Sequence, residues 1–198
     1  MSLLDNHGRL RRRPLVQALF AGLGGELVVT GLGAPSWDLA ARGDRDRTFY
    51  LWGAMGLAVP TGLGLALARP GERVIVVTGD GEVMMGLGSL ATVAAAAPRN
   101  LAVLVLDNGE FGETGGQRGL SARGVDIAAV ARAAGFAETL TVAGEDAVDD
   151  LRRLLFERPG PVLAVARIAP GEDAKVLPPK DGVVLRRRFR ADLGLEQG

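Results

Sequence analysis

The chain has 198 residues, 23 basic and 23 acidic side chains, and no cysteine. This length fits one domain that buries about 70% of its unfolded surface. A formal net charge of zero gives no field that attracts nucleic acid, and the lack of cysteine excludes disulfides and thiolate metal sites. We expect one domain over residues 1–198, a reducing cytoplasmic setting and no nucleic-acid partner.

The N-terminal segment does not resemble a signal peptide, and two basic runs are interpreted as surface. Residues 1–14 carry charges but no apolar stretch, so they do not resemble a secretory signal. Arginines fill positions 11–13 and 186–188, and we interpret both runs as solvated or partner-facing surface, with a polyanion site as the alternative. The single histidine, His7, lies near the terminus and is not expected to be catalytic.

The remaining pattern alternates helices with short apolar strands. Leucine, valine and β-branched residues predict buried strands, and apolar positions at helical spacing predict the helices. Val148, Leu151 and Leu155 share one face of the last of these helices. We predict strands over residues 26–30, 73–78, 101–106 and 161–168, helices over 12–21, 126–134 and from 144 onward, and a tail, 170–198, that crosses the surface and ends in a short helix.

Two further segments are apolar on every side. Residues 51–68 contain no charge for eighteen positions, which approaches the length that spans a bilayer. Pro60 and several glycines interrupt this segment and no second span follows, so we expect a buried helix and no membrane contact. Residues 83–97 are similarly rich in alanine, leucine and methionine. Helices of this kind must be covered on all sides, so we expect another subunit to cover part of them.

Apolar strands that alternate with helices predict a three-layer α/β/α fold with a mostly parallel sheet. In such a sheet the carboxyl ends of the strands meet at one edge, where ligands bind. Asp80 follows one strand and Asn108 follows the next. Their side-chain oxygens and a nearby backbone carbonyl are the hard ligands that magnesium takes, and a phosphate would complete its coordination. A bare Gly-Asp-Gly is otherwise a common turn between a strand and a helix.

The spacing of these residues resembles the thiamine diphosphate signature. Gly79-Asp80-Gly81 is followed after twenty-six residues by Asn108 at the end of the next apolar run. The segment LWGAMG at 51–56 is similar to the one that grips the pyrimidine of the cofactor. Within this family the chain resembles the β subunits of sulfopyruvate decarboxylase and the matching part of phosphonopyruvate decarboxylase, through APSWDL, GLGSLATVA, LDNGEFGETGGQ and RRRFRADL.

The resemblance implies the thiamine diphosphate-binding fold and a set of site residues. Asp80 and Asn108 would bind Mg²⁺ through side chains and Glu110 through its carbonyl, while Met55 would bend the cofactor into its reactive V shape. As plain core filler, Met55 would have no such role. The implied cofactor-binding residues are Gly33, Ala34, Ser36, Gly53, Ala54, Met55, Gly79, Asp80, Gly81, Glu82, Asn108, Glu110, Phe111 and Gly112.

The loop over residues 109–123 is the expected substrate side. Thr114, Gln117 and Arg118 would contact a sulfonate or phosphonate end of the substrate, and we assign Thr114 and Gln117 to the catalytic set together with Met55. A plain flexible loop is the alternative. Arg118-Gly119 follows the Gly-Gly-Gln sequence, where relatives tend to have Pro-Thr, so the loop departs from the family pattern.

The resemblance also implies partners. The glutamate that activates thiamine diphosphate belongs to a separate pyrimidine-binding domain, which we expect on an α subunit, with a second copy of this chain nearby. The implied reaction is decarboxylation of a small 2-oxoacid to an aldehyde and CO2. Alternatives are a carboligase subunit, a non-catalytic scaffold subunit, a 2-oxoacid ferredoxin oxidoreductase chain, which would normally carry cysteines, and a dinucleotide-binding domain, whose glycine signature is lacking.

Overall fold

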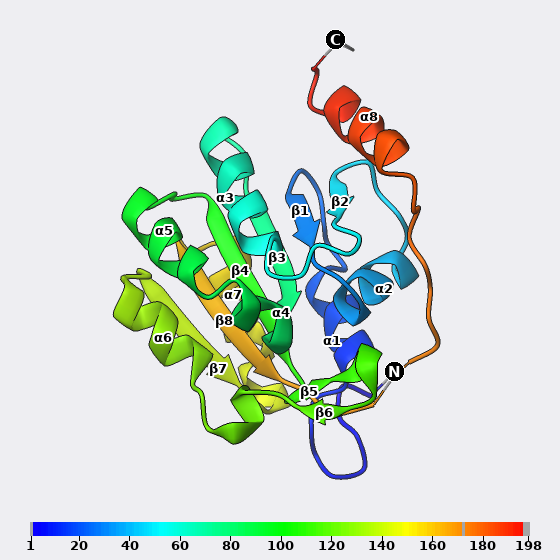
Figure 1. Cartoon of the computed structure of the whole chain (residues 1–198), viewed down its shortest axis with the longest axis vertical. Coiled ribbons are helices and arrows are strands. Elements are labelled where there is room, and N and C mark those ends of the chain that lie inside the picture. Colours follow the sequence, from blue (N-terminus) through cyan, green and yellow to red (C-terminus); the bar gives the residue numbers. More distant parts are fainter. Residues whose placement is uncertain (1, 172, 196–198) are drawn as a thin grey trace.

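The computed structural model describes residues 2–171 and 173–195 and contains a six-stranded, fully parallel sheet. The strand order is β2-β1-β3-β4-β8-β7, and the arrowheads point toward one edge of the molecule (Figure 1). This confirms the predicted fold class. The strands are β1 (Leu27–Thr30), β2 (Thr48–Tyr50), β3 (Val74–Gly79), β4 (Leu101–Asp107), β7 (Glu138–Val142) and β8 (Val162–Arg167).

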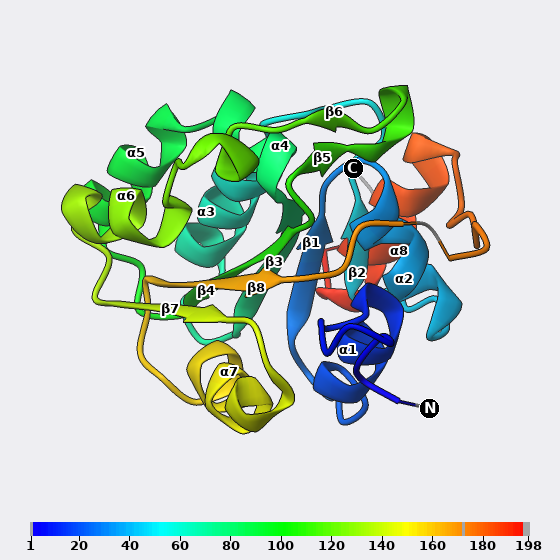
Figure 2. The same ribbon diagram turned by 90° about the horizontal axis from the view of Figure 1, so that it is seen from below.

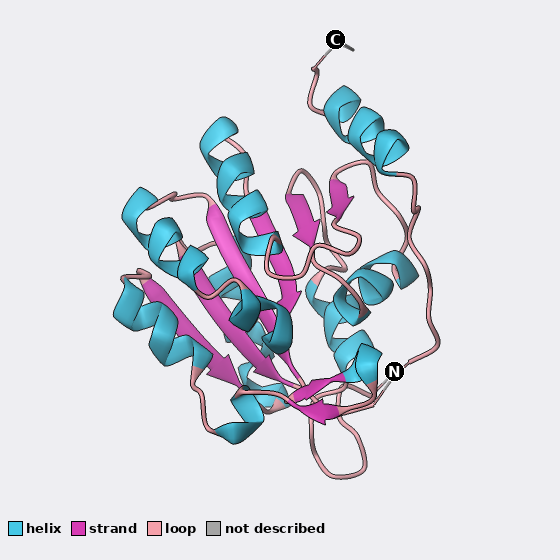
Figure 3. Cartoon of the chain, in the orientation of Figure 1, coloured by secondary structure: helices cyan, strands magenta, loops and turns pink. Residues whose placement is uncertain are grey.

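Helices cover both faces of the sheet. Figure 2 shows α3, α5 and α6 above the strands and α1 and α7 below them, and Figure 3 shows the three layers by element type. Two hydrophobic clusters, one on each face, form the core. The helices are α1 (Arg12–Leu19), α2 (Ala34–Ala41), α3 (Ala58–Ala68), α4 (Asp80–Met85), α5 (Gly88–Ala96), α6 (Ile127–Ala134), α7 (Val148–Phe156) and α8 (Gly182–Asp192).

The central strands form where the sequence is apolar on both sides. β4 is buried at six consecutive residues, as a strand covered on both faces must be. Local signals set helix ends as well: the Asp126 side chain accepts a hydrogen bond from the Ala129 amide at the start of α6, and Gly135 ends that helix with φ of 108°. Leu151 and Leu155 of α7 are fully buried, which confirms the predicted face of that helix.

Two predicted helices need correction, and two strands were not predicted. Residues 51–57 form turns, and only Ala58–Ala68 is helical. Residues 83–97 do not form one helix, because α4 ends at Met85 and α5 begins at Gly88. The sequence also gave no signal for β2 and β7. Both are edge strands, one of them only three residues long, and polar positions on β7 hide its pattern.

The tail was expected over residues 170–198, of which 172 and 196–198 lie outside the described residues, and most of its described residues are exposed. It passes α2 and ends in α8 (Figure 1). The Trp52 indole donates to the Pro179 carbonyl at 2.9 Å, and Arg188 of α8 pairs with Asp44. Leu185 and Phe189 anchor the inner face of α8. Among the described residues, no helix is both long and apolar enough to cross a membrane.

Candidate functional site

A pocket of about 360 Å³ is lined by residues that follow the strands β1, β3 and β4. Because β3 and β4 are neighbours, with Gly79 level with Leu106, the two predicted polar positions after these strands reach the same cavity. The residues that line it are Arg12, Leu32, Gly33, Ala34, Pro35, Trp37, Met55, Gly79, Asp80, Gly81, Glu82, Leu106, Asn108, Glu110, Phe111, Gly112, Glu113, Thr114, Gly116, Ile168 and Gly171.

Asp80 provides a buried carboxylate on one side of this pocket. It is 2% exposed, and Ser121 donates a hydrogen bond to its Oδ2 at 2.8 Å. Burial raises the pKa of Asp80 to about 6, although the Ser121 hydroxyl opposes this shift. A carboxylate buried away from water costs free energy, so the site is suited to a cation that would compensate its charge.

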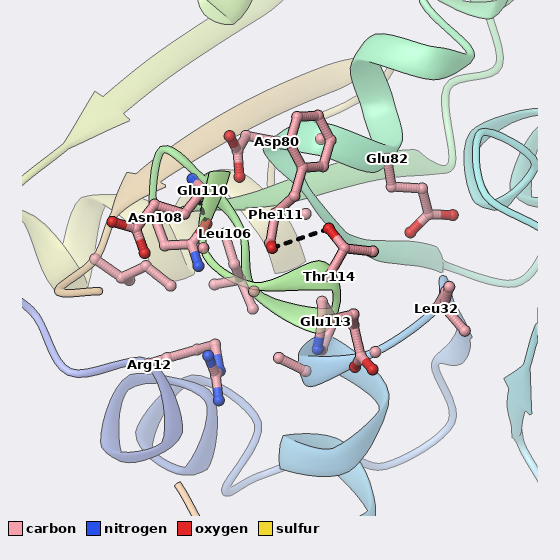
Figure 4. A pocket seen from close by; sticks show the side chains of 18 of the residues that line it. Arg12, Leu32, Asp80, Glu82, Leu106, Asn108, Glu110, Phe111, Glu113 and Thr114 are labelled. Atoms are coloured by element: carbon pink, nitrogen blue, oxygen red, sulfur yellow. Dashed lines mark hydrogen bonds between the residues drawn. The ribbon is translucent and has the colours of Figure 1, made fainter. Parts of the chain in front are cut away.

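Asn108, directly after β4, and Glu110, the first residue of β5, lie near Asp80 (Figure 4). The Asn108 Oδ1 atom accepts a hydrogen bond from the Glu110 amide at 3.1 Å, and an amide oxygen keeps a second lone pair for another partner. Both residues line the pocket with Asp80 (Figure 4). Together they offer a carboxylate, an amide oxygen and a nearby backbone, which is a donor set that fits Mg²⁺. The described residues hold no group of three or more His, Cys, Asp or Glu side chains placed for a metal.

The glycine after Asp80 is required by packing. A Cβ atom on Gly81 would lie 2.5 Å from Cε1 of Phe111, a distance that side chains do not adopt. Phe111 ends β5 (Glu110–Phe111), which pairs with β6 (Gln117–Arg118) in a short ribbon across the ends of the sheet strands (Figure 2). Gly81 therefore lets this ribbon close over the first turn of α4.

Glu82 fills the space between three segments of the site. Thr78 donates to its Oε2 at 2.9 Å, and a Cβ atom on Gly31 would lie 1.5 Å from the same oxygen. The side chain is 4% exposed, and burial raises the pKa of Glu82 to about 7. The sequence predicted a role only for the backbone of Glu82. In the structure its side chain is also buried, between β1 and α4.

The turn over residues 53–56 packs directly against the break between α4 and α5. A Cβ atom on Gly86 would lie 2.2 Å from the Gly56 carbonyl oxygen, and Gly56 has φ of 84°. These two glycines explain why the apolar segment turns before α3 and why α4 ends early. Met55, held by this turn, lines the pocket.

The exposed wall of the pocket is the glycine-rich loop that joins β5 to β6. Thr114 lines the pocket and donates to the Gln117 Oε1 atom at 2.7 Å, but Gln117 itself is not a lining residue. Arg118 donates to the Ala122 carbonyl instead. Glu113 reaches the opposite wall, because its Oε1 would lie 2.9 Å from a Cβ atom on Gly33.

The structure brings most of the predicted site residues to this pocket and leaves five outside its lining: Ser36, Gly53, Ala54, Gln117 and Arg118. Ser36 is buried, and its hydroxyl donates to the Gly31 carbonyl at 2.5 Å. That hydrogen bond holds the turn between β1 and α2 in place. The assigned roles of all these residues in cofactor binding remain predictions.

Arg12 is a lining residue that the sequence analysis placed wrongly. Residues 11–13 were interpreted as surface, yet the Arg12 side chain is 5% exposed and pairs with the fully buried Asp38 at 2.5 Å. The arginine run hid this burial, because the partner carboxylate lies 26 positions further along the chain. The remaining signal was Asp38 itself, a lone acid within an otherwise apolar helical stretch.

Known proteins share the fold and part of the sequence of this chain. Benzoylformate decarboxylase from Polynucleobacter necessarius has a similar fold, with a TM-score of 0.68 and 21% identity over 81% of this chain and 33% of that structure. Residues 39–166 match the model of the thiamine pyrophosphate enzyme C-terminal TPP binding domain. The chain therefore belongs to the thiamine pyrophosphate enzyme family, which confirms the resemblance.

Two relatives with more similar sequences are both decarboxylases by name. The chain is 44% identical to a phosphonopyruvate decarboxylase of Streptomyces viridochromogenes, over 93% of this chain and 47% of the relative. It is 35% identical to the sulfopyruvate decarboxylase subunit beta of Methanocaldococcus jannaschii, over 83% of this chain and 86% of the relative. The chain thus spans about half the length of the first relative and most of the second.

Proposed function

We propose that this chain is the diphosphate-binding subunit of a thiamine diphosphate- and Mg²⁺-dependent decarboxylase. Its substrate would be a small 2-oxoacid with a sulfonate or phosphonate end, and its products an aldehyde and CO2. The observation that carries the proposal is the meeting of Asp80, Asn108 and Met55 in one pocket at the carboxyl edge of the sheet. Membership of the thiamine pyrophosphate enzyme family supports it.

Each wall of the pocket has a part in this proposal. Asp80 and Asn108 would bind Mg²⁺ with the Glu110 carbonyl, and the backbone at Gly33, Gly79 and Gly81 would approach the diphosphate without side chains in the way. Residues of the same set that also line the pocket are Ala34, Glu82, Phe111 and Gly112. Bound thiamine diphosphate would supply an electron sink for the decarboxylation.

The chain's own side chains would place the reacting groups. Met55 would support the cofactor ring from the turn at residues 53–56, which Gly86 holds against α4. Thr114, on the exposed wall, would orient the substrate through its hydroxyl, with Gln117 as its hydrogen-bonded support. Closure of the loop between β5 and β6 would exclude water from the reacting carbon.

An α subunit would supply the pyrimidine-binding domain and the activating glutamate. Exposed apolar side chains on the α3 and α4 layer support such a partner and a second copy of this chain: Leu57 is 53%, Leu67 is 56% and Met85 is 64% exposed. Large apolar side chains grouped on one layer are typical of protein contacts. The relative from M. jannaschii is named as a subunit beta.

Calorimetry tests the proposal directly. Thiamine diphosphate is titrated into the chain with and without Mg²⁺, alone and after addition of a candidate α subunit. Magnesium-dependent binding that strengthens with the α subunit would support the split site and justify assays of 2-oxoacids. Failure to bind in every condition, while the chain remains folded by circular dichroism, would exclude the proposed function.

A further inference from the structure

One side chain that lines the pocket carries a buried guanidinium group, and it has no part in the cofactor and metal binding proposed above. Arg12 lines the pocket from the start of α1, and its Nη2 atom is buried without a hydrogen-bond partner. Figure 4 shows its side chain on the α1 side of the pocket, with Asp80 on the α4 side. An unpaired donor of a charged group costs free energy when water is excluded, so this atom is suited to a ligand.

The hydrogen bonds of the other two nitrogen atoms of Arg12 fix the position of Nη2. Nε donates to Asp38 Oδ2 at 2.5 Å, and Nη1 donates to the Gly171 carbonyl at 3.3 Å. Since a guanidinium group is planar and rigid, two anchored nitrogens determine where Nη2 lies. Asp38 stands one turn into α2, whose first residues, Ala34 and Pro35, line the same pocket. The guanidinium group is therefore held beside the start of α2.

The local charge favours an anion at this point. Asp38 is fully buried and pairs with both Arg12 and Arg13, the second at 2.9 Å. Two guanidinium groups thus share one carboxylate, which leaves an excess positive charge. Among the described lining residues, Arg12 is the one basic side chain. The carboxylates of Asp80 and Glu82 lie on the α4 side of the pocket, whereas Glu113 reaches Gly33 at the start of α2 (Figure 4). The pocket thus offers carboxylates for a cation near α4 and one cationic donor for an anion near α1.

We propose that Arg12 Nη2 binds a tetrahedral oxyanion in this pocket. The inference rests on the proposed function, which offers two sources for that group: the terminal phosphate of thiamine diphosphate, or the sulfonate or phosphonate end of the 2-oxoacid. In either case Arg12 binds the ligand directly, and Asp38 is the positioning residue that holds the guanidinium group in place.

Matched variants of the two arginines test this role. Arg12→Met removes the guanidinium group of a lining residue together with its unpaired Nη2 atom. Arg13→Met removes the other partner of Asp38, on a side chain that does not line the pocket. Each variant leaves Asp38 with one arginine, so their effects on folding are comparable. Arg12→Lys serves as a second variant that keeps the charge but loses the fixed geometry.

Two titrations by calorimetry distinguish the sources, with circular dichroism as the check on folding. The first uses inorganic pyrophosphate with Mg²⁺, and the second uses methylphosphonate on the chain saturated with magnesium and thiamine diphosphate. Loss of a charge-assisted hydrogen bond predicts a fall in affinity of about 10- to 100-fold for Arg12→Met. Arg12→Lys should lie between Arg12→Met and the wild type, and Arg13→Met should match the wild type.

Each result has a defined meaning. A loss confined to pyrophosphate assigns the anion to the cofactor, and a loss confined to methylphosphonate assigns it to the substrate. Equal affinities of wild type, Arg12→Met and Arg13→Met for both probes would overturn the role of Arg12 while leaving the proposed function intact. Wild-type chain that binds neither pyrophosphate nor thiamine diphosphate, even with the α subunit, would overturn both.

Discussion

The pocket has two walls of opposite character. The inner wall, Asp80 and Glu82 of α4 with Arg12 of α1, is at most 5% exposed, and Glu82 packs against Gly31, which accepts no side chain. The outer wall, the loop between β5 and β6, is largely exposed and is held by short-range hydrogen bonds such as Thr114 to Gln117. We infer that the inner wall is formed before any ligand arrives, whereas the outer wall adapts to it.

The largest expected effect is at the inner wall. Asp80→Asn should lower the affinity for magnesium and thiamine diphosphate by about 100-fold or more, because an amide is a weaker ligand than a carboxylate. The free energy of unfolding of the apo chain should not fall, since the variant removes a buried charge. Calorimetry and urea denaturation measure the two quantities.

Asp149→Asn is the matched control, because Asp149 is exposed on α7 and does not line the pocket. It should retain wild-type affinity. An Asp80→Asn chain that keeps its magnesium-dependent affinity would remove Asp80 from the proposed ligand set.

The second prediction concerns the close contact between Gly86, at the end of α4, and the Gly56 carbonyl. Gly86→Ala should destabilise the fold by about 2 kcal/mol, because its Cβ would meet the backbone oxygen of Gly56 at 2.2 Å. Gly88→Ala has open space within 4 Å and should be neutral or slightly stabilising. Urea denaturation compares the two, and equal stabilities would show that the contact between residues 56 and 86 yields easily.

A substitution in the outer wall should affect substrate binding but not cofactor binding. Thr114→Val removes the hydroxyl that donates to Gln117, and we expect the KM for the 2-oxoacid to rise about tenfold. Cofactor affinity should stay near that of the wild type. Steady-state kinetics of the complex with the α subunit and calorimetry give the two values. If Thr114→Val weakened cofactor binding as strongly as Asp80→Asn, the distinction between the walls would be wrong.

The smallest effect is expected outside the pocket, where α8 is joined to the body of the chain. Burial alone raises the pKa of Asp44, but the hydrogen bond and charge of Arg188 outweigh it and hold the pKa below its usual value. The pair therefore stabilises the fold above the unfolded pKa of about 3.9, and this contribution is lost as pH falls through the lower folded value.

Because the Asp44 pair is partly exposed, its contribution should be about 0.5 kcal/mol. Asp44→Asn should flatten the acid limb of the stability curve by that amount, measured by thermal unfolding between pH 3 and pH 6. An acid limb unchanged by Asp44→Asn would show that the tail is held by its apolar contacts alone, through Leu185 and Phe189.

The sequence by itself determined the sheet, the order of the central strands along the chain and the two polar positions at their ends. Asp80 and Asn108 were predictable because they follow long apolar runs, and parallel strands bring such ends to one edge. Helix faces such as that of Leu151 and Leu155 were predictable for the same reason, since their periodicity is local.

Only the tertiary structure decided which side chains face the pocket. The burial of Arg12 depends on Asp38, and the early end of α4 depends on the carbonyl of Gly56. The edge strands β2 and β7 form mainly because a neighbouring strand offers hydrogen bonds to them. These features come from contacts between residues far apart in the chain, and no local pattern of hydrophobicity records such contacts.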